Sequence, residues 1–228
     1  MKKLAILLPG FLDSKDYPHL VDLDEKLKKL EYTTVRLNPT GTWGDSEDAS
    51  KYTMTQYLAD VDAEIKKQGQ YDEILLAGHS LGGTIALIYA SRHPQVTTTI
   101  GIMSPTTYIR DENLEKIEKW KKEGLKTSSR NLPEDETTSR KFILPYSFIE
   151  DAEQYDVVKE IPNFHGNMLL IAGELDDCVV PQQLKDIYNV ANQPKVLIEM
   201  EGIGHDYRHN AREVESVNNN VINFLKDL

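Results

Sequence analysis

One short motif constrains this chain more than any other feature. The residues GHSLG occupy positions 78–82, directly after an apolar run at Glu73–Ala77 and directly before a helical pattern at Leu81–Ser91. Strand, sharp turn and helix are the setting in which GxSxG exposes a serine hydroxyl. Its glycines are needed because the serine backbone is strained and strand and helix must close around it. The motif therefore predicts a chain in which strands and helices alternate.

The rest of the chain keeps this alternation. Apolar and β-branched runs predict six strands, at Leu4–Leu8, Thr33–Leu37, Glu73–Ala77, Thr97–Ile102, Asn167–Ala172 and Lys195–Met200. Helical patterns lie at Pro18–Leu30, Tyr52–Lys67, Leu81–Ser91, Pro181–Val190 and Ala211–Leu225. Strands that alternate with helices form a mostly parallel sheet flanked by helices. We therefore predict an α/β fold with a six-stranded sheet.

Length and charge narrow the class of protein. The 228 residues suit one domain over positions 1–228, and 39% hydrophobic with 28% charged residues is typical of soluble globular proteins. A net charge of -11 disfavours nucleic acid and anionic membrane surfaces as partners. The one cysteine, Cys178, excludes an intrachain disulfide, and no apolar run is long enough to span a bilayer. We expect a cytoplasmic protein in which Cys178 is a small packing residue.

The segment from Pro105 to Pro162 interrupts the alternation, because it is too long for a simple connection between two strands. A cap at Asp111 predicts a helix that ends at Gly124 and carries an apolar face of Leu114, Ile117 and Trp120. The polar stretch from 126 to 140 predicts a loop or a short hairpin. Long insertions are usually functional, so we expect a lid over an active site.

A serine hydroxyl is a weak nucleophile until a histidine, itself oriented by an acid, takes its proton. In the setting of GxSxG the chain order is serine, acid, histidine. Of the six histidines, His205 lies in a glycine-framed loop after the last predicted strand. His209 follows in the same loop and is the alternative, although we expect it to face solvent at a helix start. Ser80 and His205 are therefore the predicted nucleophile and base.

The acid is expected just after the penultimate predicted strand, where two aspartates are adjacent. Counting from Gly173 favours Asp176, whereas counting back from Pro181 favours Asp177. We predict Asp176, because the position of the acid is set by the strand that it follows.

Ester hydrolysis also needs backbone donors for the oxyanion. One should be the N–H of Leu81, directly after the nucleophile. The other should come from the loop after the first strand, where Phe11 is the candidate.

Four motifs, PGFLDS, GHSLGG, GELDDCVVP and GIGHDY, together resemble the α/β-hydrolase superfamily from about Leu4 to Leu225. The chain is most similar to small bacterial carboxylesterases of the cinnamoyl and feruloyl esterase kind. In that family HGF supplies the oxyanion loop, and here Pro9 stands where the histidine is usual. The resemblance implies the same five site residues: Ser80, Asp176, His205, Phe11 and Leu81.

The resemblance implies a serine hydrolase that cleaves small carboxylic esters through an acyl-enzyme, with no metal or organic cofactor. The expected partner is a small acyl ester. Thioesterase, lipase and peptidase activities are alternatives within the fold, and a non-catalytic ligand-binding homologue is an alternative of another class. Aromatic residues in the insertion are expected to bind the acyl group: Tyr108, Trp120, Tyr146 and Phe148.

Overall fold

Six parallel strands form the central sheet of the computed structural model, which describes residues 1–44 and 48–228. They are β1 (Lys3–Leu8), β2 (Tyr32–Arg36), β3 (Glu73–His79), β4 (Thr98–Ile102), β7 (Asn167–Gly173) and β8 (Lys195–Met200). Across the sheet their order is β2, β1, β3, β4, β7, β8, and every neighbouring pair is parallel. The predicted six-stranded α/β sheet is confirmed.

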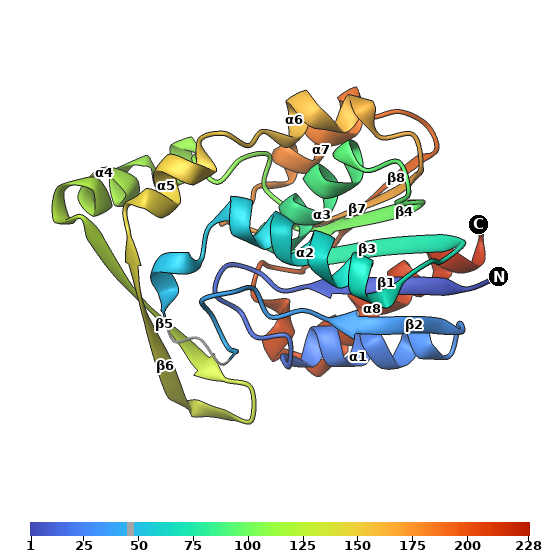
Figure 1. Cartoon of the computed structure of the whole chain (residues 1–228), viewed down its shortest axis with the longest axis horizontal. Helices are drawn as coiled ribbons and strands as arrows, with labels where there is room; N and C mark the ends of the chain where they lie inside the picture. The colour runs from blue at the N-terminus through green and yellow to red at the C-terminus, as the bar shows by residue number, and fades with distance from the viewer. Residues whose placement is uncertain (45–47) are drawn as a thin grey trace.

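Helices cover both faces of this sheet (Figure 1). One face carries α2 (Met54–Gln68), α3 (Leu81–Arg92) and α7 (Pro181–Val190), and the other carries α1 (Pro18–Lys28) and α8 (Ala211–Lys226). Side chains alternate along β1, so Leu4 and Ile6 pack with the first group of helices and Leu7 with the second. Burial on both sides explains the apolar runs of the inner strands β1, β3 and β7.

Helix α8 shows how the sequence builds these layers. The Asn210 side chain caps it by accepting hydrogen bonds from the N–H groups of Arg212 and Glu213. Val217 and Val221, four residues apart, are fully buried against the sheet. Burying each of these side chains contributes about 1.5–3 kcal/mol, so the face of the helix rather than its propensity holds it in place.

The segment between β4 and β7 forms structure of its own. It contains α4 (Leu114–Glu123), the strands β5 (Leu125–Leu132) and β6 (Asp135–Pro145), and the short helices α5 (Ser147–Ala152) and α6 (Val157–Glu160). Short 3₁₀ turns lie at Ala49–Lys51, Asp111–Asn113, Ile161–Asn163 and Tyr207–His209. The polar stretch that predicted a loop or a short hairpin is a long antiparallel hairpin, β5 with β6.

The expected helix in this segment forms, but its predicted cap at Asp111 is wrong. Asp111 lies in a 3₁₀ turn, and α4 begins after Asn113. The Asn113 side chain does not cap α4, since it accepts a hydrogen bond from the Arg110 N–H and donates one to the Tyr108 carbonyl. Gly124 ends the helix with φ +70°, as predicted. Of the expected apolar face, Ile117 and Trp120 are buried and Leu114 is exposed.

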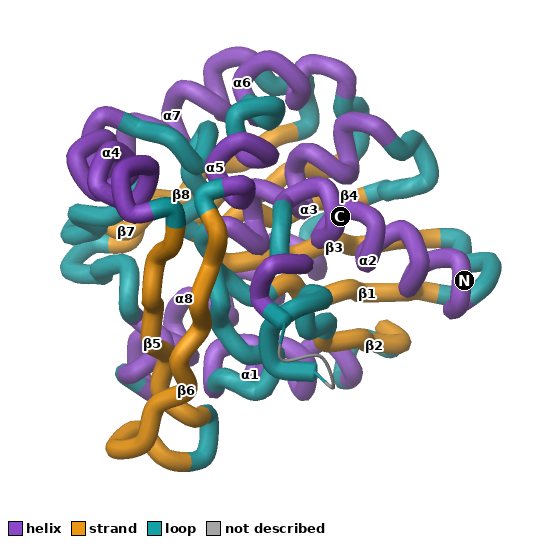
Figure 2. The backbone as a smooth tube through the Cα atoms, turned by 60° about the vertical axis from the view of Figure 1, so that its left-hand side comes forward, coloured by secondary structure: helices purple, strands orange, loops and turns teal. Residues whose placement is uncertain are grey.

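The hairpin crosses the end of the sheet where the parallel strands terminate. In Figure 1 the strands run from right to left, and β5 and β6 pass along the left side, beyond the carboxyl ends of β1 and β3. Figure 2 shows the two strands as a separate ribbon that leaves the helices α4 and α5 and extends toward α1. Ligands of open α/β sheets bind at this edge, so the insertion lies where a site is expected.

Within the described parts of the chain, none of the helices has both the length and the apolar character needed to cross a bilayer.

Candidate active site

Ser80 lies at the sharp turn between β3 and α3. Its φ of 53° and ψ of −125° place it outside the regions that side-chain-bearing residues prefer, at a cost of about 1–3 kcal/mol. Two glycines make the turn possible. A Cβ on Gly78 would lie 2.3 Å from the Gly82 carbonyl carbon, and a Cβ on Gly82 would lie 2.1 Å from the Leu8 carbonyl oxygen. Glycine is therefore required for strand, turn and helix to close.

A chain of two hydrogen bonds links Ser80 to an acid. His205 Nε2 lies 3.0 Å from Ser80 Oγ, and His205 Nδ1 lies 2.8 Å from Asp176 Oδ2. The histidine follows β8 and the aspartate follows β7, so the three side chains meet at the carboxyl edge of the sheet. Such an arrangement can take the serine proton as the hydroxyl attacks a carbonyl carbon.

Both oxygens of Asp176 are held. Oδ2 faces His205, and Oδ1 accepts the backbone N–H groups of Cys178 at 2.9 Å and Val179 at 2.7 Å. The side chain is only 3% exposed, which fixes its orientation. Asp177, the alternative from the sequence, borders the open cavity and is exposed. The geometry thus brings Asp176, not Asp177, to His205.

The surroundings of His205 favour its charged form. Burial alone would lower the pKa, but the hydrogen bond with Asp176, assisted by one with the Cys178 thiol, outweighs it and raises the pKa of His205 to about 9. An imidazole with a raised pKa is a stronger base once it is deprotonated.

Below His205 lie three buried rings, His79, His19 and Tyr207. The His79 ring is 4.8 Å from the His205 ring, and His79, His19 and Tyr207 contact one another edge to face at 5.2–5.6 Å. Neither ring nitrogen of His19, nor the Tyr207 hydroxyl, has a hydrogen-bond partner among the described residues. Burial lowers the pKa of His19 to about 3 and that of His79 well below its ordinary value, so both are neutral.

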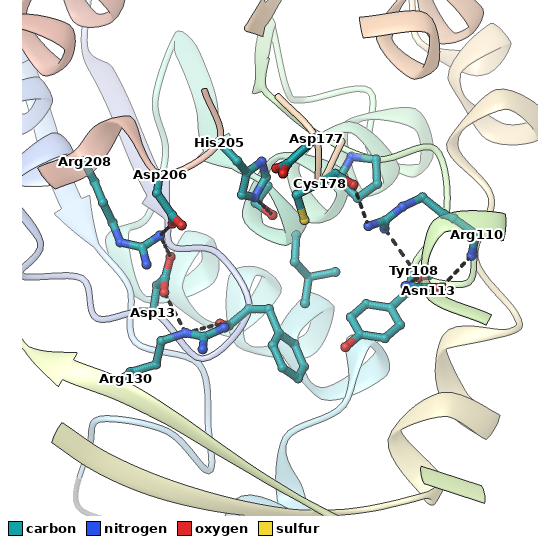
Figure 3. A pocket seen from close by; sticks show the side chains of 14 residues that line it. Asp13, Tyr108, Arg110, Asn113, Arg130, Asp177, Cys178, His205, Asp206 and Arg208 are labelled. Carbon is teal, nitrogen blue, oxygen red and sulfur yellow. Dashed lines mark hydrogen bonds and ion pairs between the residues drawn. The ribbon is translucent and has the colours of Figure 1, made fainter. Parts of the chain in front are cut away.

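A cavity of about 320 Å³ opens above Ser80 (Figure 3). Its wall includes Ser80 and His205, and both residues predicted to supply oxyanion donors, Phe11 and Leu81. The Phe11 loop passes close to the serine, since a Cβ on Gly10 would lie 3.4 Å from Ser80 Cβ. Four of the five predicted site residues therefore border one space, and the fifth, Asp176, lies behind His205.

The sequence of the N-terminal half of the chain assigns it to a family. The family model of the alpha/beta hydrolase fold matches residues 4–126, which is more than half of the chain. The chain belongs to the alpha/beta hydrolase fold family. No curated protein sequence matches this alpha/beta hydrolase.

Solved structures of low sequence identity share the fold. Est1E from Butyrivibrio proteoclasticus, determined with ferulic acid bound, is 20% identical with a TM-score of 0.76, over 99% of this chain and 88% of that chain. The alpha/beta hydrolase GrgF from Penicillium sp. sh18 is 17% identical with a TM-score of 0.80, over 99% and 90% of the two chains. A structure from work on the metagenome-derived lipolytic enzymes LipS and LipT is 16% identical with a TM-score of 0.77, over 100% and 95%.

Of the four aromatic residues of this alpha/beta hydrolase that were expected to bind substrate, only Tyr108 lies in the wall of the cavity. Trp120 and Phe148 are buried and stack on each other with ring centroids 5.9 Å apart. Phe148 packs in turn against the edge of Phe11 at 5.2 Å. These two residues support the wall from behind, and Tyr146, which packs against Trp120, is not part of it.

His209 lies at the surface, as expected, whereas Cys178 departs from the expectation. His209 is at the surface, where its Nδ1 lies 3.2 Å from Glu136 Oε1, so it does not reach Ser80. Cys178 is not the packing residue that we expected: its side chain is exposed and lines the cavity. The turn around Asp176 Oδ1 directs Cys178 there, and the hydrogen bond with His205 lowers the pKa of the thiol.

Sequence reasoning missed five charged residues of the cavity wall: Asp13, Arg110, Arg130, Asp206 and Arg208. Asp13 belongs to the PGFLDS motif and Arg208 follows His205 by three residues, so their nearness to the site was a readable signal. Arg110 and Arg130 come from the insertion, where no local pattern marks them. No group of three or more His, Cys, Asp or Glu side chains is arranged to hold a metal ion within residues 1–44 and 48–228.

Proposed function

We propose that this alpha/beta hydrolase cleaves small carboxylic esters through an acyl-enzyme formed on Ser80. The observation that carries the proposal is the pair of hydrogen bonds from Ser80 Oγ through His205 to Asp176, at 3.0 and 2.8 Å. Support comes from the strained backbone of Ser80, which presents its hydroxyl at the floor of a cavity.

In the proposed reaction His205 Nε2 takes the Ser80 proton as Oγ attacks the ester carbonyl. The N–H groups of Phe11 and Leu81 stabilise the oxyanion, and the start of α3 adds the positive end of a helix dipole. Protonated His205 then gives its proton to the leaving alcohol, which leaves an acyl group on Ser80. A water molecule, deprotonated by the same histidine, releases the acid, while Asp176 stays ionised and orients the imidazole throughout.

The size of the cavity supports a small acyl group. A volume of about 320 Å³ is at the lower end for ligand pockets, and the aromatic rings of Phe11 and Tyr108 form part of its wall. Est1E, which shares the fold, binds ferulic acid, a compound with an aromatic ring. We propose short or aromatic acyl esters as the substrate class.

We further propose that the chain is a single domain in which residues 105–162 act as a lid over the site. Four residues of this segment, Pro105, Tyr108, Arg110 and Asn113, border the cavity near the start of the insertion. Arg130 borders it from the hairpin, so the segment meets the cavity at two separate points. A lid in this position would shape the acyl site.

Covalent labelling tests the proposal. A fluorophosphonate should label the protein and leave Ser80→Ala unlabelled, and the substitution should reduce ester turnover by on the order of 10⁴ or more. His205→Ala should abolish the acylation burst, while His209→Ala, which removes a surface imidazole of the same loop, should retain it. Labelling that survives Ser80→Ala would overturn the assignment. A protein that neither labels nor turns over any ester would support a binding function instead.

A further inference from the structure

The loop that carries Phe11 has an unusual backbone. Leu12 has φ +59°, in the left-handed region that a leucine rarely adopts. Its polar groups are bonded by side chains from elsewhere in the chain: the Leu12 N–H donates to the Tyr52 hydroxyl at 3.4 Å, and the Trp43 indole N–H donates to the Leu12 carbonyl at 2.8 Å. A strained conformation of this kind persists only where its surroundings hold it.

Arg130 also holds this loop, through its contacts with Phe11 and Asp13. Its Nε and Nη2 both donate to the Phe11 carbonyl, at 3.1 and 2.8 Å, and Nε also donates to Asp13 Oδ1 at 3.1 Å. The guanidinium lies over the Phe11 ring as well, 5.8 Å from its centroid. Arg130 belongs to β5, so a side chain of the insertion holds a carbonyl 119 residues earlier in the chain.

Asp13 extends this contact to the loop of His205. Its carboxylate is 3% exposed, and Oδ2 accepts from Arg208 Nη1 at 3.2 Å. Figure 3 shows Asp13 between Arg130 on one side and Arg208 on the other. A buried carboxylate is stable only when it is paired, and here its two partners come from the insertion and from the segment after His205.

We propose that Arg130 is a positioning residue for the oxyanion site. Arg130 fixes the Phe11 carbonyl and thereby the orientation of Phe11, whose N–H faces the charge that develops on the oxyanion. The insertion then contributes to bond making as well as to substrate choice. This inference rests on the proposed esterase function. Hydrogen bonds to an oxyanion depend on donor placement within a fraction of an ångström, so loss of this support should act on kcat rather than on KM.

The test compares Arg130→Met with Lys141→Met, which removes one positive charge from an exposed position on the partner strand of the same hairpin. With p-nitrophenyl acetate, kcat of Arg130→Met should fall by about 10–100-fold, with KM changed less than about threefold. Affinity for an aryl trifluoromethyl ketone, which forms an oxyanion on the serine, should fall in parallel with kcat. Lys141→Met should behave as wild type.

Two further measurements separate positioning from general instability. Arg130→Lys should show most of the fall in kcat that is expected for Arg130→Met, because one ammonium group cannot reproduce the planar guanidinium that reaches both Phe11 and Asp13. Millimolar guanidinium should restore part of kcat to Arg130→Ala, whose folding is checked by circular dichroism and thermal unfolding. Wild-type kcat and ketone affinity in Arg130→Met or Arg130→Lys would overturn the inference. Failure of the wild type to hydrolyse esters or to be labelled at Ser80 would instead overturn the proposed function.

Discussion

Asp176 Oδ2 lies 2.8 Å from His205 Nδ1, while the adjacent Asp177 points its side chain to the cavity. Asp176→Asn should therefore reduce kcat by about 10⁴, because an amide neither selects the required imidazole tautomer nor stabilises the imidazolium. Asp177→Asn is the matched control and should change kcat by less than about tenfold. Steady-state hydrolysis of p-nitrophenyl acetate measures both, and a severe loss in Asp177→Asn alone would exchange their roles.

The raised pKa of His205 predicts an alkaline activity profile. The base must be neutral to accept the serine proton, so kcat/KM should rise with pH as His205 loses its proton. Because the pKa of His205 is about 9 rather than the ordinary 6.5, the midpoint of this rise should lie well above 6.5. A pH–rate profile of kcat/KM with a midpoint at or below 6.5 would contradict the prediction.

Cys178 offers a way to check the cause of that shift. The hydrogen bond with the Cys178 thiol raises the pKa of His205, although by less than the hydrogen bond with Asp176. Cys178→Ala should therefore move the midpoint of the kcat/KM profile to lower pH. The thiol takes no part in the proposed reaction, so the plateau at high pH should stay close to wild type. Identical midpoints in the two proteins would show that the thiol does not influence the base.

Tyr108 should influence which acyl groups are accepted. It is the aromatic residue of the insertion that lines the cavity, with its ring 5.3 Å from Phe11. Tyr108→Ala enlarges the cavity, so kcat/KM for octanoyl and cinnamoyl esters should rise about tenfold relative to acetyl esters. Tyr146→Ala, in the same segment but away from the cavity, should leave the ranking unchanged. An unaltered ranking in Tyr108→Ala would exclude Tyr108 from acyl selection.

The turn at Ser80 should not tolerate a methyl group at Gly82. A Cβ there would overlap the Leu8 carbonyl, so Gly82→Ala should lower the free energy of unfolding by about 1–3 kcal/mol or more and displace Ser80. Gly44 has no atom within 4 Å of its added Cβ, and Gly44→Ala should be neutral by comparison. Urea unfolding measures both, and equal stability of Gly82→Ala and wild type would contradict the crowding at this turn.

Much of the fold and the central hydrogen-bonded set could be predicted because their signals are local. The strands β3 and β7 contain continuous apolar runs. Ser80 follows β3 directly, within the GxSxG motif, and His205 follows Gly204 in the loop after β8. The choice between Asp176 and Asp177 could be argued only by counting. Geometry separates them, since backbone N–H groups of the following turn bind Asp176 Oδ1.

Contacts between distant segments could not be predicted. Nothing near Arg130 in the sequence indicates that it reaches Phe11, because the pairing depends on how the hairpin lies across the sheet. The same limit explains why the roles of the aromatic residues of the insertion could not be predicted. Composition predicts that they bury surface, but it does not reveal whether Trp120 and Phe148 face a ligand or each other.

The rings beneath His205 bear on the path of the reaction's proton. His79 and His19 stay neutral under all conditions in which the proposed reaction would run, and burial raises the pKa of Tyr207 far above neutrality. None of the three offers a place for a proton that leaves Ser80. The inner side of the imidazole is thus lined by rings that do not take up its proton, and proton exchange at His205 takes place on the side that faces Ser80 and the cavity.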